Sequence, residues 1–437
     1  MSVGFVHLSD IHFGQEKGGD FWTHNDAKER LIDDVRSMVK TFGAERATGI
    51  IVTGDIAYAG RAEEYRDAAA WLDRVAEAAG CEITDIQVVP GNHDVDRDEI
   101  TAATEMMLSK IVVEGESALD EFLKTEADRE MLFRRFSAYR PFAEGYRCPL
   151  DTKAELAEER TVELAPGRSI RFIRLNSALV CSKKDEEGKL LLGARQRVLG
   201  QRPGEELVVL SHHPVHWFQD SKDALLFIRS RARIFISGHE HNPSVKIEAI
   251  DAGCDLMMLA AGATVPPTSE GKFTYCYNFI EFDWDSEKDA LSVHVHPRAW
   301  VDEKKRFEAD DVRLGGREPK CLLACPNFRG APLAKEAPEE RFALDSASDT
   351  IIIVPPDDQN LEAREDTMVD TYPLLLLRFF RDISPAQRVG ILSSLGALPP
   401  SWKGRLSEPF ERNAFDSLVR AGRSEELWAQ LRGILNG

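Results

Sequence analysis

Residues 86–94 read Ile-Gln-Val-Val-Pro-Gly-Asn-His-Asp, and the arrangement in this stretch recurs along the chain. An apolar run typical of a buried strand ends in a turn that carries an amide, an imidazole and a carboxylate. Ligand sites of open α/β sheets gather at strand ends, so we expect segments of this kind to meet in the folded chain. Four others place polar groups at or just past an apolar run: Asp10-Ile11-His12, Gly54-Asp55, His212-His213-Pro214 and Gly238-His239-Glu240-His241.

Strand and helix patterns alternate around this stretch. The apolar runs Val3–Leu8, Gly49–Thr53 and Ile86–Val89 are separated by two segments with helical spacing, and this βαβαβ order predicts a largely parallel sheet. Helix formers dominate residues 97–140, which predicts a helical insertion. From residue 169 onward the apolar runs are short and close together, which predicts a second, more antiparallel sheet from Ile170–Leu175, Leu207–Leu210, Ile234–Ser237, Val245–Ala249, Leu256–Ala260, Tyr275–Phe282 and Leu291–His296.

Changes in composition divide the chain into three parts. Residues 1–301 predict an α/β fold in which two sheets pack face to face with helices outside, an αββα sandwich. Residues 302–370 contain many prolines and hold 10 Lys and Arg against 17 Asp and Glu, so we expect an acidic linker. Residues 371–437 return to helical periodicity, and Ser384-Pro385-Ala386-Gln387 has the N-cap serine and first-turn proline of a helix start. We therefore expect a small C-terminal all-α domain of four helices.

The net charge of the 437 residues is −19, from 55 Lys and Arg against 74 Asp and Glu. Most of this acidity falls on residues 1–301, which disfavours binding of long duplex nucleic acid by bulk charge, although a small phosphodiester held by metal ions remains compatible. No segment approaches the roughly 20 apolar residues of a membrane-spanning helix. We therefore expect no membrane contact. The seven cysteines include no CxxC pair, so we expect free thiols and a cytoplasmic location.

The five polar segments supply a set of metal-binding groups. Carboxylates, imidazoles and one amide suit Mn, Fe, Zn or Co, and no thiolates of a structural zinc site are among them. Residues two apart point to one side of an extended segment, which would pair Asp10 with His12 and His239 with His241. The set exceeds the needs of one ion, whereas two ions that share a carboxylate would use all of it: Asp10, His12, Asp55, Asn92, His212, His239 and His241. Two-metal sites catalyse phosphoryl transfer and nucleic-acid hydrolysis.

The ordered motifs D-x-H, G-D, G-N-H-D, H and G-H-x-H resemble those of the calcineurin-like metallophosphoesterase superfamily. The resemblance implies two mixed sheets flanked by helices and a binuclear centre, with manganese the favoured metal and iron or zinc the alternatives. It assigns one ion to Asp10, His12 and His241. It assigns the other to Asn92, His212 and His239, with Asp55 as the bridging ligand.

The resemblance also implies a reaction. A hydroxide between the two ions would attack phosphorus in line with the leaving oxygen, while Asn92 stabilises the charge on the phosphoryl oxygens. His93 would face the phosphate or the leaving oxygen, and Asp94 would orient its ring. Of the two adjacent imidazoles, His212 is the expected ligand and His213 is the alternative.

Two phrases indicate the class of substrate. Leu8-Ser-Asp-Ile-His12 and Ser211-His-His-Pro214 resemble the branch that contains bacterial cyclic-nucleotide and glycerophosphodiester phosphodiesterases. We therefore expect a phosphodiesterase for a cyclic nucleotide or another small phosphodiester. A metal-dependent nuclease and a phosphomonoesterase are the alternatives.

The C-terminal segment suggests a second kind of function. Residues 374–387 and Glu425-Glu426-Leu427-Trp428 resemble the small helical effector-associated domains of bacterial conflict systems, which are adaptor modules that recruit partners by like-with-like contact. The resemblance implies a protein partner for residues 371–437 and an effector role in defence, or a recruitment module as the main function. The alternative is a helical extension that packs on the enzyme.

Two further features each have two possible interpretations. His294-Val295-His296 places two imidazoles on one strand face, but no third ligand lies nearby in the sequence, so we interpret the pair as part of a polar sheet face. Asn176 ends a predicted strand, and either a place near the site or a structural role would fit it.

Overall fold

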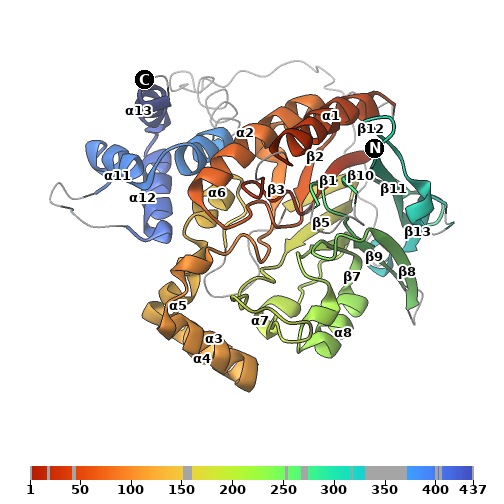
Figure 1. Ribbon diagram of the computed structural model, residues 1–437, viewed down its shortest axis with the longest axis horizontal. Coiled ribbons are helices and arrows are strands. Elements are labelled where there is room, and N and C mark those ends of the chain that lie inside the picture. Colours follow the sequence, from red (N-terminus) through yellow and green to blue (C-terminus); the bar gives the residue numbers. More distant parts are fainter. Residues whose placement is uncertain are drawn as a thin grey trace, which may run out of the picture. The chain divides into compact units, whose positions relative to one another are not determined.

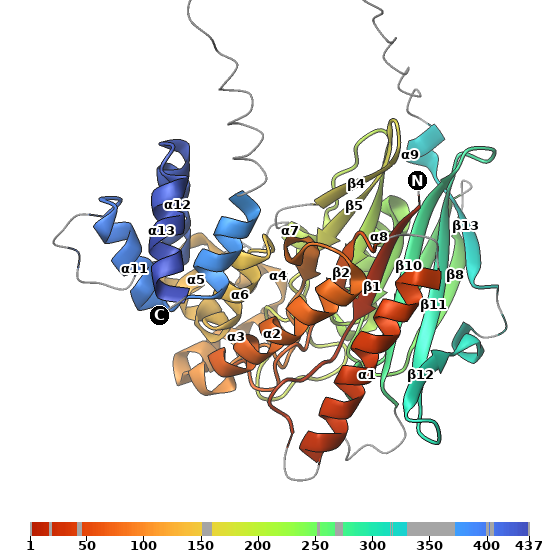
Figure 2. The same ribbon diagram turned by 90° about the horizontal axis from the view of Figure 1, so that it is seen from above.

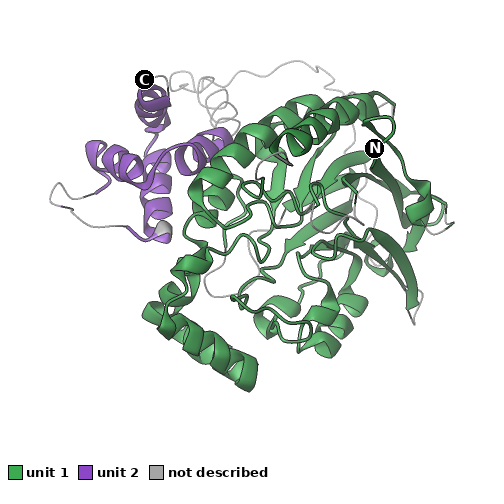
Figure 3. Ribbon diagram, in the orientation of Figure 1, with its two compact units in different colours: residues 1–332 green, residues 333–437 purple. Residues whose placement is uncertain are grey.

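The computed structural model describes residues 2–16, 20–41, 46–150, 160–250, 254–266, 274–314, 318–329, 372–398 and 406–435, with residues 316 and 402. The chain divides into two compact units, residues 1–332 and 333–437 (Figure 3). The described strands all belong to the first unit, and the described part of the second is helical.

The first sheet contains the strands on either side of the opening motifs. Its order is β12-β11-β10-β1-β2-β3, with β13 also paired to β11. The strands β1 (Val3–Leu8), β2 (Gly49–Val52) and β3 (Ile86–Val88) are parallel, as the βαβαβ pattern predicts. The others are antiparallel to their neighbours: β10 (Cys276–Asp285), β11 (Ala290–Val301), β12 (Arg306–Ala309) and β13 (Lys320–Ala324).

The crossover helices lie along one face of this sheet (Figures 1 and 2). They are α1 (Asp20–Thr41) and α2 (Ala62–Ala79), and a short turn of 3-10 helix, Ile83–Asp85, leads into β3. α2 buries an apolar stripe that includes Leu72 and Val75, and it ends at Gly80, whose φ of 71° is the left-handed conformation that glycine adopts without steric cost.

The second sheet is mostly parallel, whereas we expected a more antiparallel one. Two of the runs that we expected in it, Tyr275–Phe282 and Leu291–His296, belong instead to β10 and β11 of the first sheet. Its order is β4-β5-β6-β7-β9-β8, in which the four central strands run parallel. The parallel connection between β6 and β7 requires a crossover, which α8 (Ser221–Arg231) supplies. Only Ala224 and Ile228 of α8 are buried, so the helix has a weak apolar stripe. The strands are β4 (Arg160–Ala165), β5 (Arg168–Arg174), β6 (Glu205–Leu210), β7 (Ala232–Ser237), β8 (Ser244–Ile250) and β9 (Cys254–Ala260).

One hydrophobic core joins the two sheets, as the αββα prediction requires. Phe5 of β1 packs edge to face on Phe172 of β5, with ring centroids 5.2 Å apart, and Phe282 of β10 completes the aromatic group. The two faces that meet here are apolar and form the core. The polar residues follow the ends of the strands, so they lie at the edge of the sandwich.

The helix-rich span over residues 97–140 forms a series of short helices after β3. Each of α3 and α4 buries an apolar stripe, and Thr101 caps α3 by accepting a hydrogen bond from the backbone of Thr104. The series consists of Arg97–Glu99, α3 (Ala102–Glu114), α4 (Glu116–Lys124), α5 (Glu126–Phe133), Arg134–Phe136 and α6 (Tyr139–Gly145).

The span that we expected to be a linker begins inside the first unit. Residues 302–329 contain β12, a 3-10 turn at Asp311–Leu314, β13 and α9 (Pro326–Arg329). Leu323 of β13 and Phe328 of α9 are buried in the main core, so these two elements pack as part of the first unit. The rest of the expected linker, residues 330–370, lies outside the described residues.

The second unit has a hydrophobic core of its own. Its helices are a segment over residues 372–381, α11 (Pro385–Ser394), α12 (Glu408–Arg420) and α13 (Ser424–Leu435). The predicted start of α11 is confirmed, because Ser384 and Gln387 form a reciprocal capping box with proline in the first turn. Among the described residues of the whole chain, no helix is both long and apolar enough to cross a membrane.

Candidate metal centre

The five polar segments meet at one edge of the sandwich. Residues 10–12, 55 and 92–94 follow β1, β2 and β3 of the first sheet, and residues 212, 239 and 241 follow β6 and β7 of the second. Contacts between side chains connect the two sheets, for example the 3.2 Å approach of His241 Nε2 to Asp10 Oδ1. The convergence expected from the strand-end pattern is therefore present.

Tight turns carry most of these side chains. Asp10, His12, Asp55, His239 and His241 have φ between 51° and 74°, the left-handed region. The pairs therefore converge through turns, and the extended backbone that we expected for them is not what the structure has. The backbone of Asp10 donates to Gly54 O at 3.0 Å, which holds the first turn against the second.

Asp55 lies between two groups of donors. Its Oδ2 is 3.4 Å from His12 Nε2 and 3.3 Å from His212 Nε2, while its Oδ1 accepts a 2.8 Å hydrogen bond from the backbone of His93. Gly91 makes this approach possible, because a Cβ at residue 91 would collide with the Asp55 carboxylate. One carboxylate oxygen thus faces imidazoles that come from both sheets.

Asn92 organises the second group. Its Oδ1 lies 3.2 Å from His212 Nε2 and 3.1 Å from His239 Nδ1. The His212 ring donates from Nδ1 to Thr53 O at 2.8 Å, so Nε2 is the atom that it presents to the site. The amide oxygen of Asn92 and two ring nitrogens therefore surround one point.

Burial and charge set the protonation of this cluster. Burial raises the pKa of Asp10, but the neighbouring His241 and His212 lower it by more, so the carboxylate is ionised. Burial lowers the pKa of His212, whereas Asp55 and Asp10 raise it, to about 9. Burial and the nearby His212 lower the pKa of His239 to about 4. Without a metal, protonated His212 therefore balances part of the negative charge of Asp10 and Asp55.

The donor set fits metal ions. Asp10 Oδ1 is buried and faces His241 Nε2 at 3.2 Å without a well-formed hydrogen bond among the described residues, and a cation at this point would stabilise it further. Mixed imidazole and carboxylate ligands suit divalent ions. Overlapping groups of three have ligand atoms within 4.8 Å of one another: Asp10, His12 and His241; Asp10, Asp55 and His212; His12, Asp55 and His93; and His212, His213 and His239.

Residues 4–243 match the model of the calcineurin-like phosphoesterase family, and this match covers more than half of the chain. The chain belongs to that family. This match confirms the family that the motifs predicted. A second match, over residues 371–432, is to the model of the GTPase-associated adaptor domain.

Individual relatives of this phosphoesterase are distant. The uncharacterized metallophosphoesterase-like protein YydB of Bacillus subtilis (strain 168) is 25% identical over 283 residues. The alignment covers 61% of this chain and 54% of YydB, so the chain spans about half the length of that relative. Among solved structures, a Vps29 double mutant from Entamoeba histolytica is 10% identical with a TM-score of 0.31, covering 73% of this chain and 99% of Vps29. The NAD nucleotidase NadN of Haemophilus influenzae is 10% identical with a TM-score of 0.34, covering 72% of this chain and 54% of NadN.

His93 of the phosphoesterase lies beside the cluster, but Asp94 does not orient its ring as we expected. The ring donates from Nδ1 to Tyr58 O at 2.7 Å and stacks on the Tyr58 ring, with centroids 5.1 Å apart and planes inclined by 25°. Asp94 instead accepts hydrogen bonds from the backbone of Ala57 and Gly91 and from the hydroxyl of Tyr65. Asp94 therefore holds the turn after β3 against the turn after β2, because backbone donors at short range satisfy its buried carboxylate.

His212 and His213 differ in what they face. His213 Nδ1 is 2.9 Å from Ser177 Oγ, and its Nε2 is 3.9 Å from Cys181 Sγ, whereas His212 Nε2 faces Asp55 and Asn92. Both imidazoles are fully buried. This geometry favours His212 as the group that reaches a metal in the phosphoesterase centre.

The structure also adds residues that the motifs did not indicate. Tyr58 is one. Nothing in the sequence around it indicates that its ring stacks on His93. Ser9 is another: its hydroxyl donates to Asp10 Oδ2 at 2.5 Å and so fixes the carboxylate. Such supporting contacts depend on the fold and have no spacing rule in the sequence.

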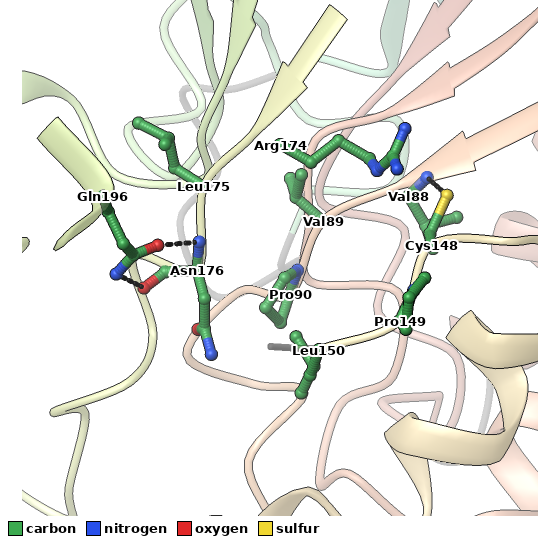
Figure 4. Close-up of a pocket in the computed structure, with 10 residues that line it drawn as sticks. All are labelled: Val88, Val89, Pro90, Cys148, Pro149, Leu150, Arg174, Leu175, Asn176 and Gln196. Carbon is green, nitrogen blue, oxygen red and sulfur yellow. Dashed lines mark hydrogen bonds between the residues drawn. The ribbon is translucent and has the colours of Figure 1, made fainter. Parts of the chain in front are cut away.

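A pocket lies between the ends of β3 and β5 of the phosphoesterase domain, with a volume of about 320 Å³ including its open mouth (Figure 4). Pro90, which immediately precedes the Gly91 turn, lines one side, and Asn176 and Gln196 line another. The side-chain amide of Asn176 is buried and has no hydrogen-bond partner among the described residues. The pocket is adjacent in the chain to the site, because Pro90 immediately precedes the Gly91 turn and Asn176 immediately precedes Ser177, which contacts His213 at 2.9 Å.

Proposed function

We propose that this chain is a binuclear metal-dependent phosphodiesterase. The observation that carries the proposal is the overlap of the donor groups at Asp55, whose Oδ2 faces His12 on one side and His212 on the other. In this proposal Asp10, His12 and His241 hold one ion. Asn92, His212 and His239 hold the second, and Asp55 is shared. When bound, such ions polarise phosphoryl oxygens and lower the pKa of a bound water.

The chain's own residues would orient the substrate and move a proton. With its Oδ1 directed at the two imidazoles, Asn92 has its Nδ2 hydrogens to donate to a phosphoryl oxygen. The Nδ1 hydrogen of His93 is engaged by Tyr58 O, so Nε2 is the atom that exchanges a proton with the substrate. Burial lowers the pKa of His93, so the metal-free ring is neutral and its protonation is coupled to the arrival of an anionic phosphate.

The neighbouring pocket supports a diester as the substrate. A diester carries a second ester group that needs a place beside the phosphorus, and the pocket offers apolar walls with the unpaired amide of Asn176. In this proposal the substrate is a small phosphodiester such as a cyclic nucleotide, and manganese is the favoured metal, with iron or zinc as alternatives. Five described cysteines are free thiols, which supports a cytoplasmic location: Cys81, Cys148, Cys181, Cys276 and Cys325.

The test is a substrate panel with the Mn²⁺-loaded full chain. We expect faster turnover of bis(p-nitrophenyl) phosphate than of p-nitrophenyl phosphate, and turnover of at least one of the 2′,3′- or 3′,5′-cyclic nucleotides. Hydrolysis of the monoester alone would identify a phosphomonoesterase. Preferential cleavage of single-stranded DNA, duplex DNA or RNA would identify a nuclease, and either result would contradict the proposal.

We also propose that residues 371–437 recruit a protein partner. The match to the GTPase-associated adaptor domain and the separate hydrophobic core support this second role. In this proposal the phosphoesterase is an effector of a bacterial conflict or defence system, brought to its target by like-with-like contact through the helical unit.

A further inference from the structure

A second group of metal-binding side chains lies on other strands than those that carry the phosphoesterase centre. Glu281 of β10 and His294 and His296 of β11 have ligand atoms within 4.8 Å of one another. His296 Nε2 is 2.8 Å from Glu281 Oε2, and His294 Nδ1 is 3.6 Å from the same oxygen. Two imidazole nitrogens thus converge on one carboxylate oxygen.

Strand register brings the three side chains together. In the antiparallel pairing of β10 and β11, Glu281 lies directly opposite His294, and His296 is the next residue on the same face. Val293 and Val295 belong to the core between the sheets, so the alternation of a strand directs His294 and His296 to the outer face. The third ligand, missing from the local sequence around the histidines, comes from the neighbouring strand.

The group is partly shielded from water. The side chains of Glu281 and His296 are 18% and 16% exposed, and that of His294 is 34% exposed. On the same face, Arg298 Nη2 lies 2.6 Å from Asp34 Oδ1 of α1. Helix α1 therefore covers the face of the sheet next to this group. Partial burial strengthens the interaction of the donors with a cation, while the open side allows the cation to enter.

We propose that Glu281, His294 and His296 form a further metal site that binds Zn²⁺ or a similar divalent ion. Zinc ligands at about 2.0–2.1 Å in a tetrahedral arrangement lie about 3.3 Å from one another, and the two separations of 2.8 and 3.6 Å to the carboxylate oxygen bracket this value. Two imidazoles and one carboxylate leave a fourth position for water. A metal here would clamp β10 to β11 on the outer face of the first sheet.

Zinc stoichiometry tests the proposal with the full chain. The metal-stripped protein is saturated with Zn²⁺, freed of excess metal by gel filtration and analysed by inductively coupled plasma mass spectrometry. We expect Glu281→Gln, His294→Ala and His296→Ala each to bind one zinc equivalent per chain fewer than the unmodified protein. Turnover of the model diester by the Mn²⁺-loaded variants should be unchanged, which shows that the fold and the phosphoesterase centre are intact.

Two further variants complete the test. Glu248→Gln alters a strand carboxylate that contacts Arg229 and Lys246, so it is a matched control that should keep the full zinc content. Lys320 is exposed and lies opposite His294 on β13, so Lys320→Ala removes a nearby positive charge and should tighten the weakest zinc-binding step in calorimetry severalfold. Equal zinc content in the unmodified chain and in the Glu281, His294 and His296 variants would overturn the proposal, as would an unchanged affinity in Lys320→Ala.

Discussion

Several residues of the candidate metal centre adopt a left-handed backbone conformation that residues other than glycine rarely take. Asp10, His12, Asp55, His239 and His241 have positive φ, and each such residue costs on the order of 1 kcal/mol or more. Contacts such as the 3.0 Å hydrogen bond from the His12 backbone to Asp55 O hold the turns in place. The motifs D-x-H and H-x-H predict which side chains converge. They do not predict this conformation, because it depends on contacts between strands that are distant in the sequence.

His93 is the residue whose change should separate metal binding from turnover. His93→Ala removes the ring whose Nε2 would exchange a proton with the substrate, and general acid or base catalysis is worth roughly 10²–10⁴-fold. We expect kcat on the model diester to fall within that range while manganese content stays the same. Loss of manganese in this variant would instead assign His93 to the ligand set, since it lies within reach of His12 and Asp55.

Tyr58 should act as a positioning residue for His93. Its ring stacks on the imidazole with 5.1 Å between centroids, while the hydrogen bond to His93 comes from its backbone carbonyl. Tyr58→Ala therefore removes the stacking and leaves the hydrogen bond, and we expect kcat to fall severalfold with a changed pH profile of kcat. Tyr58→Phe keeps the ring and is the matched control. If Tyr58→Phe lost as much activity as Tyr58→Ala, the hydroxyl and not the stacking would be responsible.

At the scale of elements, the parallel strands of the first sheet were predictable, but its antiparallel strands were not: we expected β10 and β11 in the second sheet, and they lie in the first. The buried runs of β1, β2 and β3, separated in turn by α1 and α2, give a clear βαβαβ signal. α8 buries only two side chains, so its weak apolar stripe gave little signal of the helical crossover from β6 to β7. Likewise, β12 and β13 lie in a stretch whose prolines and charges indicate a linker, although Phe307 and Leu323 are buried. Local composition did not reveal either feature because tertiary packing determines both.

A buried ion pair between β6 and β7 should make stability depend on pH. Glu206 and Arg233 are fully buried, and Arg233 Nε lies 3.3 Å from Glu206 Oε2 without a hydrogen bond between them. Burial raises the pKa of Glu206 to about 7, and Arg233 only partly offsets it. In the unfolded chain the same carboxyl has its ordinary pKa near 4.5. The unfolded state therefore loses its proton first, and this group's contribution to stability falls as pH rises from about 4.5 to about 7.

Glu206→Gln removes this dependence. We expect the free energy of unfolding of the metal-free unmodified chain to fall between pH 5 and pH 7.5 relative to that of Glu206→Gln. The measurement is urea unfolding, monitored by near-ultraviolet circular dichroism. Glu63→Gln, a change at an exposed position of α2, is the control and should run parallel to the unmodified chain. Parallel curves for Glu206→Gln as well would show that Glu206 keeps the same protonation in both states.

At the scale of the whole molecule, each unit has its own hydrophobic core, and the metal centre lies entirely in the first. The residues proposed for hydrolysis are complete by residue 241, and the strands that support them are complete by residue 324. A chain that ends at Pro332 should therefore keep the manganese content and diester turnover of the full chain. The helical unit should carry the second property, capture of a partner, because its core forms without any residue of the first unit.

Affinity capture with the full chain and with the chain ending at Pro332 tests this division of roles. The expected result is that a protein bearing a domain of the same adaptor kind is retained by the full chain, and by residues 372–437 alone, but not by the shortened chain. A Phe415→Asp change in the full chain places a charge in the core of the helical unit and should abolish capture while turnover persists. Equal capture with and without residues 333–437 would assign the partner surface to the phosphoesterase unit. Loss of turnover in the shortened chain would show that the helical unit takes part in catalysis, since the proposed metal ligands are all retained.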